Sequence, residues 1–222
     1  MNTTTLKKRL LEVAARLEQR YGDLGWNSAS LPLDVLVETI LSHNTTDHNR
    51  DIAYRALKAA YPSWQALVEA PCERLAEVIR PAGLNHQKAE RIQTVLRTLY
   101  EEQGAFTLDP LHALSRDEAL AALTRFVGVG KKTAGIVLTF ALDKPYFPVD
   151  THIKRITRRL GWVKQGQDPH EVMNALTPLA LIKPFHLQLI QHGRDTCKAR
   201  KPLCGECLLS DLCPAFGGEV PF

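Results

Sequence analysis

The stretch Phe126-Val127-Gly128-Val129-Gly130-Lys131-Lys132-Thr133 joins two helical segments, DEALAALTRF at 117–126 and KKTAGIVLTFAL at 131–142. Glycines at alternate positions of this turn allow positive φ, which can point successive backbone N–H groups outward. The helix that follows adds the free N–H groups and the partial positive charge of its N-terminus. Together these groups could hold a phosphate without reading a base sequence. Glycine also commonly ends a helix, so the turn by itself leaves that simpler explanation open.

Lys132 is placed unusually for a lysine. It stands in the first turn of the second helix, where the helix dipole disfavours a cation. Its neighbour Lys131 is also a cation, and both effects favour the neutral amine that a nucleophile needs. A surface lysine that binds a phosphate fits the same local sequence, so a nucleophile and a phosphate ligand both remain possible at this stage.

Helical periodicity continues on both sides of the turn, and strand signals are nearly absent. The chain therefore predicts an all-α fold with short connections and no repeat. The expected helices lie at 4–20, 32–42, 47–60, 73–79, 84–102, 116–126, 131–142, 151–160, 169–181 and 184–195.

The composition is that of a soluble globular protein, with 45% hydrophobic and 23% charged residues. No stretch reaches the roughly 18 apolar residues that cross a membrane. The N-terminus lacks the apolar segment of a secretory signal, so we expect a cytoplasmic protein. Residues 151–201 carry a net charge of +7 and the rest of the chain −3. A basic region on a near-neutral body suits a polyanion such as DNA, although a solvated basic face has the same composition.

Four of the five cysteines fall close together, in the pattern Cys197-x6-Cys204-x2-Cys207-x5-Cys213. Four thiolates in so short a loop can converge on one metal centre. Zinc usually takes two CxxC-like pairs with a longer spacer, whereas the outer spacings here favour the wider cage of a [4Fe–4S] cluster. Zinc stays an alternative on spacing alone, and disulfides are disfavoured because nothing else indicates secretion.

The loop between the first two of these cysteines is basic. Lys198, Arg200 and Lys201 would form a rigid phosphate-binding surface if metal fixed both ends of the loop. The same charges could instead offset the negative charge of a thiolate-bound cluster, and the two roles are compatible.

Asp150 lies in the segment Phe147-Pro148-Val149-Asp150-Thr151-His152-Ile153. Its simplest role is to cap the helix expected at 151–160. A carboxylate in that position stays ionised, and if it faced Lys132 it could transfer protons or stabilise a developing cation. One side chain can perform both roles.

In combination these residues resemble the endonuclease III branch of the helix–hairpin–helix DNA glycosylase superfamily. The resemblance runs from about Leu33 to Cys213. It rests on the following segments: Leu41-Ser42-x-Asn44-Thr45-Thr46-Asp47, Gly83-Leu84 through Lys88-Ala89, Gly128-Val129-Gly130-Lys131-Lys132-Thr133, Val149-Asp150-Thr151-His152, His192-Gly193-Arg194 and the four cysteines.

The resemblance implies a two-lobed all-α fold. Residues 25–144 would form a six-helix barrel domain with the helix–hairpin–helix, and residues 1–24 and 145–222 a domain with a [4Fe–4S] cluster. The four cysteines match the cluster ligands, which favours iron–sulfur over zinc. Lys132 matches the family's nucleophile and Asp150 its catalytic carboxylate.

The implied function is that of a bifunctional DNA glycosylase and AP lyase of base excision repair. It would remove oxidised pyrimidines from double-stranded DNA and cleave 3′ to the abasic site by β-elimination. We expect a monomer that has no membrane partner. The residues expected to contact DNA are Asn44, Leu84, Gly128, Val129, Gly130, Lys131, Thr133, His152, Lys198, Arg200 and Lys201.

Leu84 would be an apolar wedge inserted into the base stack, where the local sequence alone predicts a leucine packed inward at a helix start. The chain also departs from the family pattern. Asn44 stands where relatives usually have glutamine, His43 beside it is unusual, and Val127 replaces a proline. These departures leave the lesion preference open. The alternative functions are a monofunctional base or mismatch glycosylase of the same superfamily and a weakly active DNA-binding iron–sulfur protein.

Overall fold

The computed structural model describes residues 3–26 and 30–218. All regular structure in these residues is helical, which confirms the predicted all-α class. The chain divides into two compact units, one formed by Met1–Asn27 with Pro145–Phe222 and the other by Ser28–Lys144. No helix among the described residues combines the length and the apolar character that crossing a membrane requires.

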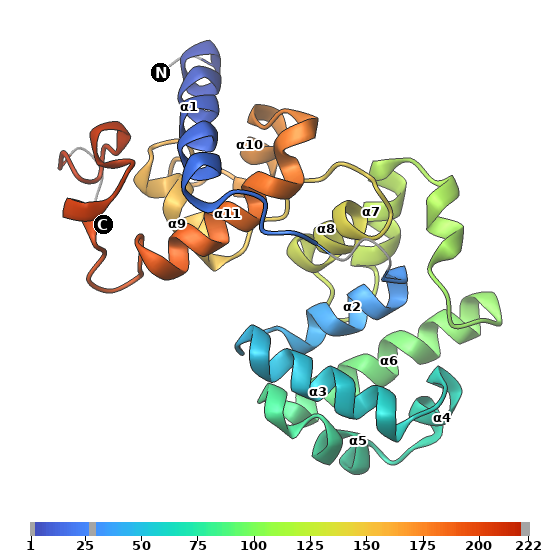
Figure 1. Ribbon diagram of the computed structural model, residues 1–222. Helices are drawn as coiled ribbons and strands as arrows, with labels where there is room; N and C mark the ends of the chain where they lie inside the picture. The colour runs from blue at the N-terminus through green and yellow to red at the C-terminus, as the bar shows by residue number, and fades with distance from the viewer. Residues whose placement is uncertain (1–2, 27–29, 219–222) are drawn as a thin grey trace. The chain divides into compact units, whose positions relative to one another are not determined.

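The unit of residues 28–144 contains α2 to α8 (Figure 1). Helix α2 packs against α8, α7 also packs against α8, and α5 packs against α6. The bounds are α2 Pro32–Leu41, α3 Asp47–Ala60, α4 Trp64–Glu69, α5 Cys72–Val78, η1 Arg80–Ala82, α6 Asn85–Gln103, η2 Asp109–Ala113, α7 Arg116–Thr124 and α8 Lys131–Phe140.

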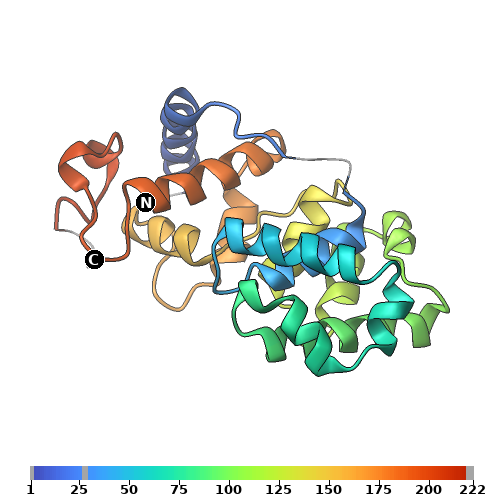
Figure 2. The ribbon, with the colours of Figure 1, turned by 60° about the horizontal axis from the view of Figure 1, so that its bottom comes forward.

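The other unit is built on α11, against which α1 and α9 both pack (Figure 2). Its core includes Leu10 and Leu17 of α1, Ile153 of α9 and Phe185 of α11. The bounds are α1 Thr3–Tyr21, α9 Thr151–Arg159, α10 Pro169–Leu176, η3 Leu179–Leu181, α11 Ile182–Asp195, η4 Cys204–Glu206 and η5 Ser210–Leu212.

Side-chain caps fix several helix starts. Ser115 and Glu118 form a complete capping box at α7, Thr46 caps α3, and Ser63 caps the short α4. These polar side chains satisfy N–H groups that have no partner within the helix. The starts predicted at 116 and 47 are therefore confirmed.

Four of the ten predicted helices have an end that is wrong by two residues or more. Those expected at 116–126 and 131–142 end at Thr124 and Phe140, and the other two differ for clear reasons. The helix expected at 169–181 ends at Leu176, because Thr177 precedes a proline and adopts an extended backbone. A separate 3-10 turn, η3, follows. The helix expected at 184–195 begins earlier, at Ile182, and places Pro184 in its first turn, where no N–H is needed.

Candidate active site

The turn before α8 uses only one of its two glycines in a left-handed conformation. Gly128 has φ of +78°, and a Cβ there would lie 2.0 Å from Nε of Arg91. Gly130 is extended, with φ of −93° and ψ of 177°. Of the two glycines, which both allow positive φ, only Gly128 adopts it. Its backbone conformation favours glycine, and a Cβ there would require the side chain of Arg91 to move.

Val129 lies between the two glycines and is buried, with 4% of its surface exposed. Its N–H donates to the carbonyl of Phe126 at 3.0 Å. The expectation that successive N–H groups of this turn point outward is therefore wrong at Val129. The N–H groups of the first turn of α8 remain suited to an anion, because an α-helix leaves them without a partner in the helix.

Lys132 is the second residue of α8 and is half-buried, whereas Lys131 is exposed. Every residue from Thr133 to Phe140 is buried, so the helix behind Lys132 is anchored along its whole length. The hydroxyl of Thr133 lies 3.1 Å from Nε2 of His43, which belongs to the turn after α2. Burial, together with the nearby cations Lys132, Arg91 and Lys88, lowers the pKa of His43 to about 4.

Two exposed side chains in the same unit as α8 have a left-handed backbone. Asn44 has φ of +53°, and Leu84 has φ of +46° and is 51% exposed. Left-handed φ is uncommon for residues other than glycine and is rare for leucine. The inward-packed alternative for Leu84 is thus wrong, and its side chain projects into solvent at the start of α6.

Lys88 connects the two turns that present Asn44 and Leu84. Its side chain is buried, and Nζ donates to the carbonyl of Leu41 at 2.8 Å and to that of Ala82 at 2.7 Å. Burial lowers its pKa to about 8. Lys88 belongs to one of the motifs that resemble the family, but its sequence context predicts no role for it. The available signal was its place on the buried face of α6, one turn before Ile92.

Asp150 is the N-cap of α9, and its Oδ1 accepts a hydrogen bond from the N–H of Ile153 at 2.8 Å. The capping role is therefore confirmed. His152 follows in the first turn, where its Nδ1 lies 3.1 Å from Nη2 of Arg155. A Cβ on Gly193 would come within 2.7 Å of the same Nδ1, so α11 can approach α9 here only through a glycine.

Cys197, Cys204, Cys207 and Cys213 line one cavity together with Arg159, Thr196 and Phe216. None of the four forms a disulfide. Burial raises the pKa of Cys204, and the neighbouring sulfurs of Cys197 and Cys213 raise it further. In the described part of the chain, no three His, Cys, Asp or Glu side chains are grouped tightly enough to hold a single metal ion. Four thiols around one cavity are the ligand set of a [4Fe–4S] cluster, and the residues fit that group.

Arginine side chains fix the loop that carries these cysteines. Nη1 of Arg159 donates to Sγ of Cys197 at 3.3 Å and to the carbonyl of Lys198 at 2.8 Å. From α1, Arg16 donates to the carbonyl of Leu208 at 2.9 Å, and Arg9 donates to that of Leu212. Nothing in the sequence marks these arginines as partners of the loop, since Arg16 lies 192 residues before Leu208 and Arg159 lies 39 residues before Lys198.

The basic loop lies between the first two cysteines. Lys198, Arg200 and Lys201 are all exposed, and Lys201 has φ of +50°. Nε of Arg155 donates to the carbonyl of Cys197 at 2.9 Å and so fixes the start of this loop. The three cations are therefore presented to solvent from a loop that is restrained at its base.

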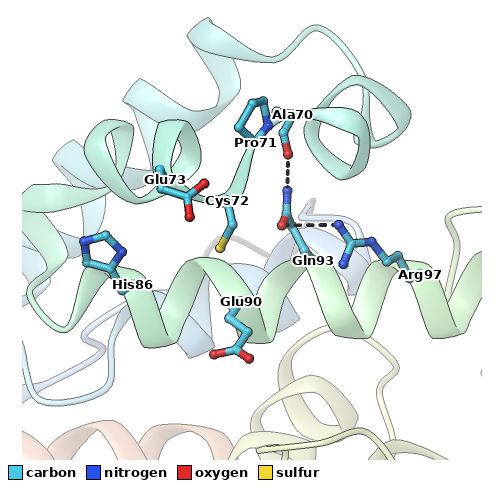
Figure 3. A pocket seen from close by; sticks show the side chains of 8 residues that line it. All are labelled: Ala70, Pro71, Cys72, Glu73, His86, Glu90, Gln93 and Arg97. Carbon is cyan, nitrogen blue, oxygen red and sulfur yellow. Dashed lines mark hydrogen bonds between the residues drawn. The ribbon is translucent and has the colours of Figure 1, made fainter.

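Cys72, the fifth cysteine, lies apart from this loop, in the other unit. It lines a surface pocket between α5 and α6 together with Glu73, His86 and Glu90 (Figure 3). The amide of Gln93 closes one side of the pocket by donating to the carbonyl of Ala70 at 2.8 Å. This pocket contains none of the residues expected to act on DNA.

Lys132 and Asp150 belong to different units, Lys132 to residues 28–144 and Asp150 to the unit that holds the cysteines. Within one unit the structure brings Lys132, Thr133 and His43 together. Within the other it brings together the four cysteines and the base of the basic loop.

Comparison with known families gives two matches. The family described as "HhH-GPD superfamily base excision DNA repair protein" matches residues 37–180. The family described as "Iron-sulfur binding domain of endonuclease III" matches residues 197–213, which run from the first to the last of the four cysteines.

Similar proteins include endonuclease III of Thermotoga maritima, 39% identical over 83% of this chain and 84% of the relative. Endonuclease III of Escherichia coli strain K12 is 33% identical over 93% of this chain and 95% of the relative. Among solved structures, one described as "Structure of a Trapped Endonuclease III-DNA Covalent Intermediate: Estranged-Adenine Complex" has a TM-score of 0.82. It is 27% identical and covers 96% of this chain and 97% of its own.

Proposed function

The chain belongs to the HhH-GPD superfamily of base excision DNA repair proteins, and we propose that Lys132 is its nucleophile and Asp150 its catalytic carboxylate. The protein is a bifunctional DNA glycosylase and AP lyase with a [4Fe–4S] cluster, and it acts on double-stranded DNA. The placement of Lys132 carries the assignment of the nucleophile. Its side chain is half-buried and lies in the first turn of α8, where free N–H groups can bind a phosphate, and every residue of α8 after it is buried.

The reaction begins with extrusion of the damaged nucleotide from the duplex, because the glycosidic carbon is inaccessible inside the stack. The neutral amine of Lys132 attacks C1′, and the bond to the base breaks with its electron pair leaving on the base. The bond between C1′ and the ring oxygen O4′ then breaks, its electron pair goes to O4′, which takes up a proton, and the sugar ring opens. The protonated Schiff base that results between Lys132 and C1′ acidifies the C2′ proton. Loss of that proton expels the 3′ phosphate and cleaves the strand by β-elimination.

Asp150 stabilises the positive charge that develops on the sugar and takes part in the proton transfers. Its cap bond to Ile153 supports this role, because a carboxylate that accepts a backbone N–H is held in place. The cap leaves the second carboxylate oxygen, Oδ2, outside the bond to Ile153.

The remaining contacts follow from exposure and charge. Leu84 is the wedge, Asn44 fills space beside it, and Gly128, Gly130, Lys131 and Thr133 form the phosphate contact at the start of α8. The basic loop of Lys198, Arg200 and Lys201, with His152, contacts the DNA backbone from the other unit. The cluster, when bound to the four cysteines, orders the basic loop.

Oxidised pyrimidines are the proposed lesions, because the chemistry requires a base that is already a good leaving group. The hairpin domain corresponds to residues 25–144 and the cluster domain to residues 1–24 and 145–222. The protein acts as a monomer in the cytoplasm.

Borohydride capture tests the assignment directly. Incubating the protein with duplex DNA that carries thymine glycol or an abasic site, and adding borohydride, is expected to give a covalent protein–DNA complex. Lys132→Gln should abolish capture because the amide cannot form a Schiff base. Asp150→Asn should lower the capture rate while keeping the cap, because the asparagine oxygen also accepts the N–H of Ile153.

Lys144→Gln is the matched control. The amine of Lys144 donates hydrogen bonds to the carbonyls of His112 and Leu114 and not to the turn that leads into α8. Capture by Lys144→Gln is therefore expected to persist. A wild-type protein that shows no capture on either substrate contradicts the lyase assignment.

A further inference from the structure

His43 sits where three separate segments of one unit meet. It belongs to the turn after α2, it contacts Thr133 of α8 through Nε2 at 3.1 Å, and it contacts Nη1 of Arg91 on α6 through Nδ1 at 3.5 Å. The side chain of Arg91 in turn passes directly over Gly128, where a Cβ would lie 2.0 Å from its Nε. The ring thus links Arg91 of α6 to Thr133 in the first turn of α8.

The two contacts fix the state of the ring. The guanidinium of Arg91 can only donate, so Nδ1 of His43 must accept. The proton then lies on Nε2, which donates to the hydroxyl of Thr133. The same arrangement requires an uncharged imidazole, because a proton on Nδ1 would face the guanidinium.

The charges around His43 agree with that state. Lys132, Arg91 and Lys88 are the cations near the ring, and together with burial they hold the pKa of His43 at about 4. An imidazolium in this position would add a fourth positive charge beside Lys132. The uncharged ring instead occupies the space with a donor and an acceptor that are both used.

We propose that His43 is a positioning residue for Lys132: through Thr133, the next residue in the chain, its ring fixes the first turn of α8 from which the lysine side chain projects. The inference rests on the proposed function, because it concerns the geometry of the proposed nucleophile. His43 departs from the pattern of the family that this sequence resembles, as do Asn44 in the same turn and Val127 in the turn before α8.

Single-turnover capture with borohydride on abasic-site DNA, at saturating DNA, tests this role. His43→Ala is expected to lower the capture rate by about tenfold while leaving the DNA dissociation constant unchanged, because the nucleophile is misplaced but the DNA contacts remain. His43→Gln should restore most of the rate, because its amide offers one donor to Thr133 and one acceptor to Arg91.

A double-mutant cycle separates positioning from general loss of structure. Thr133→Val keeps the shape of the side chain and removes the acceptor. If His43 acts through Thr133, the double variant should be no slower than the slower single variant. His112→Ala is the control, because His112 is exposed on η2 in the same unit, and its capture rate should equal that of the wild type.

Two results of the capture experiments would overturn the inference. Additive losses in the cycle would show that His43 and Thr133 act independently, and a His43→Gln variant as slow as His43→Ala would show that the two hydrogen bonds are irrelevant. Nitrogen NMR of the histidine rings tests the linkage without any reaction. A His43 ring with its proton on Nδ1 at neutral pH contradicts the proposed contacts, even if the wild-type protein captures no DNA and the lyase assignment itself is lost.

Discussion

Helix α8 and the cysteine loop, residues 196–217, reach a defined shape by different means. All eight residues from Thr133 to Phe140 of α8 are buried, so apolar packing fixes the helix. In the cysteine loop only Leu209 and Ala215 are buried. The loop is held instead by thiols that converge on one cavity and by arginines that bind its carbonyls.

The difference shows how each segment is stabilised. The packing of α8 needs no ligand, since its folding free energy comes from apolar burial against α2 and α7. The cysteine loop buries too little apolar surface to offset the entropy of ordering its backbone. Its order is therefore expected to depend on the cluster that the four cysteines bind.

Removing the cluster should have the largest effect on stability, and it should unfold the cysteine loop while leaving α8 folded. Metal binding supplies on the order of 10 kcal/mol to small metal-organised folds, so Cys207→Ser or chelation should release residues 196–217. Hydrogen exchange is expected to become fast in the loop and to stay slow in α8. If the visible absorbance of the cluster were lost while hydrogen exchange in the loop stayed slow, the arginines alone would hold the loop in place.

Shortening a buried side chain of α8 should have an intermediate effect on stability. It should weaken the packing of α8 and leave the cluster bound. Leu138 is fully buried, and Leu138→Ala should lower the free energy of unfolding by about 2–5 kcal/mol. The visible absorbance of the cluster should persist below the melting temperature. Val127→Ala is the control, because Val127 is 69% exposed and its truncation should cost little. A loss of cluster absorbance in Leu138→Ala would contradict the separation of the two segments.

Neutralising the basic loop should have the smallest effect on stability. Lys198, Arg200 and Lys201 are exposed, so replacing all three with alanine should change the free energy of unfolding by about 0.5 kcal/mol or less. The plot of log affinity for DNA against log salt should become shallower by roughly 2.7, if each cation neutralises one phosphate. Replacing Lys7, Lys8 and Lys164, three exposed cations elsewhere in the unit, should leave the slope almost unchanged. An unchanged slope in the loop variant would remove the loop from the DNA interface.

The helices were predictable from the sequence because periodicity and caps are local signals. The ends of the helices were less predictable. Thr177 and Pro178, for example, end α10 although the helical spacing of apolar residues continues to Leu181. Gly130 has the same residue type as Gly128, yet it is extended, since it occupies the N-cap position of α8, where the backbone is typically extended. Residue type alone does not distinguish these two glycines.

The candidate site was predictable where chemistry resides in residue type, as with the four cysteines. It was not predictable where a side chain acts through tertiary contacts. Lys88, Arg91 and Arg159 are ordinary cations in the sequence, and only the fold places them against carbonyls, a glycine and a thiol. Cations that lie on the apolar face of a helix are the one local signal that could have identified Lys88.

The burial of Lys88 also determines how the protein responds to amine-modifying reagents. Its Nζ is enclosed, and two of its three N–H groups are donated to the carbonyls of Leu41 and Ala82. Reductive methylation of the native protein should therefore modify exposed lysines and spare this one. A molecule in which Lys88 carries methyl groups must first have let the end of α2 separate from η1, so its modification records that opening.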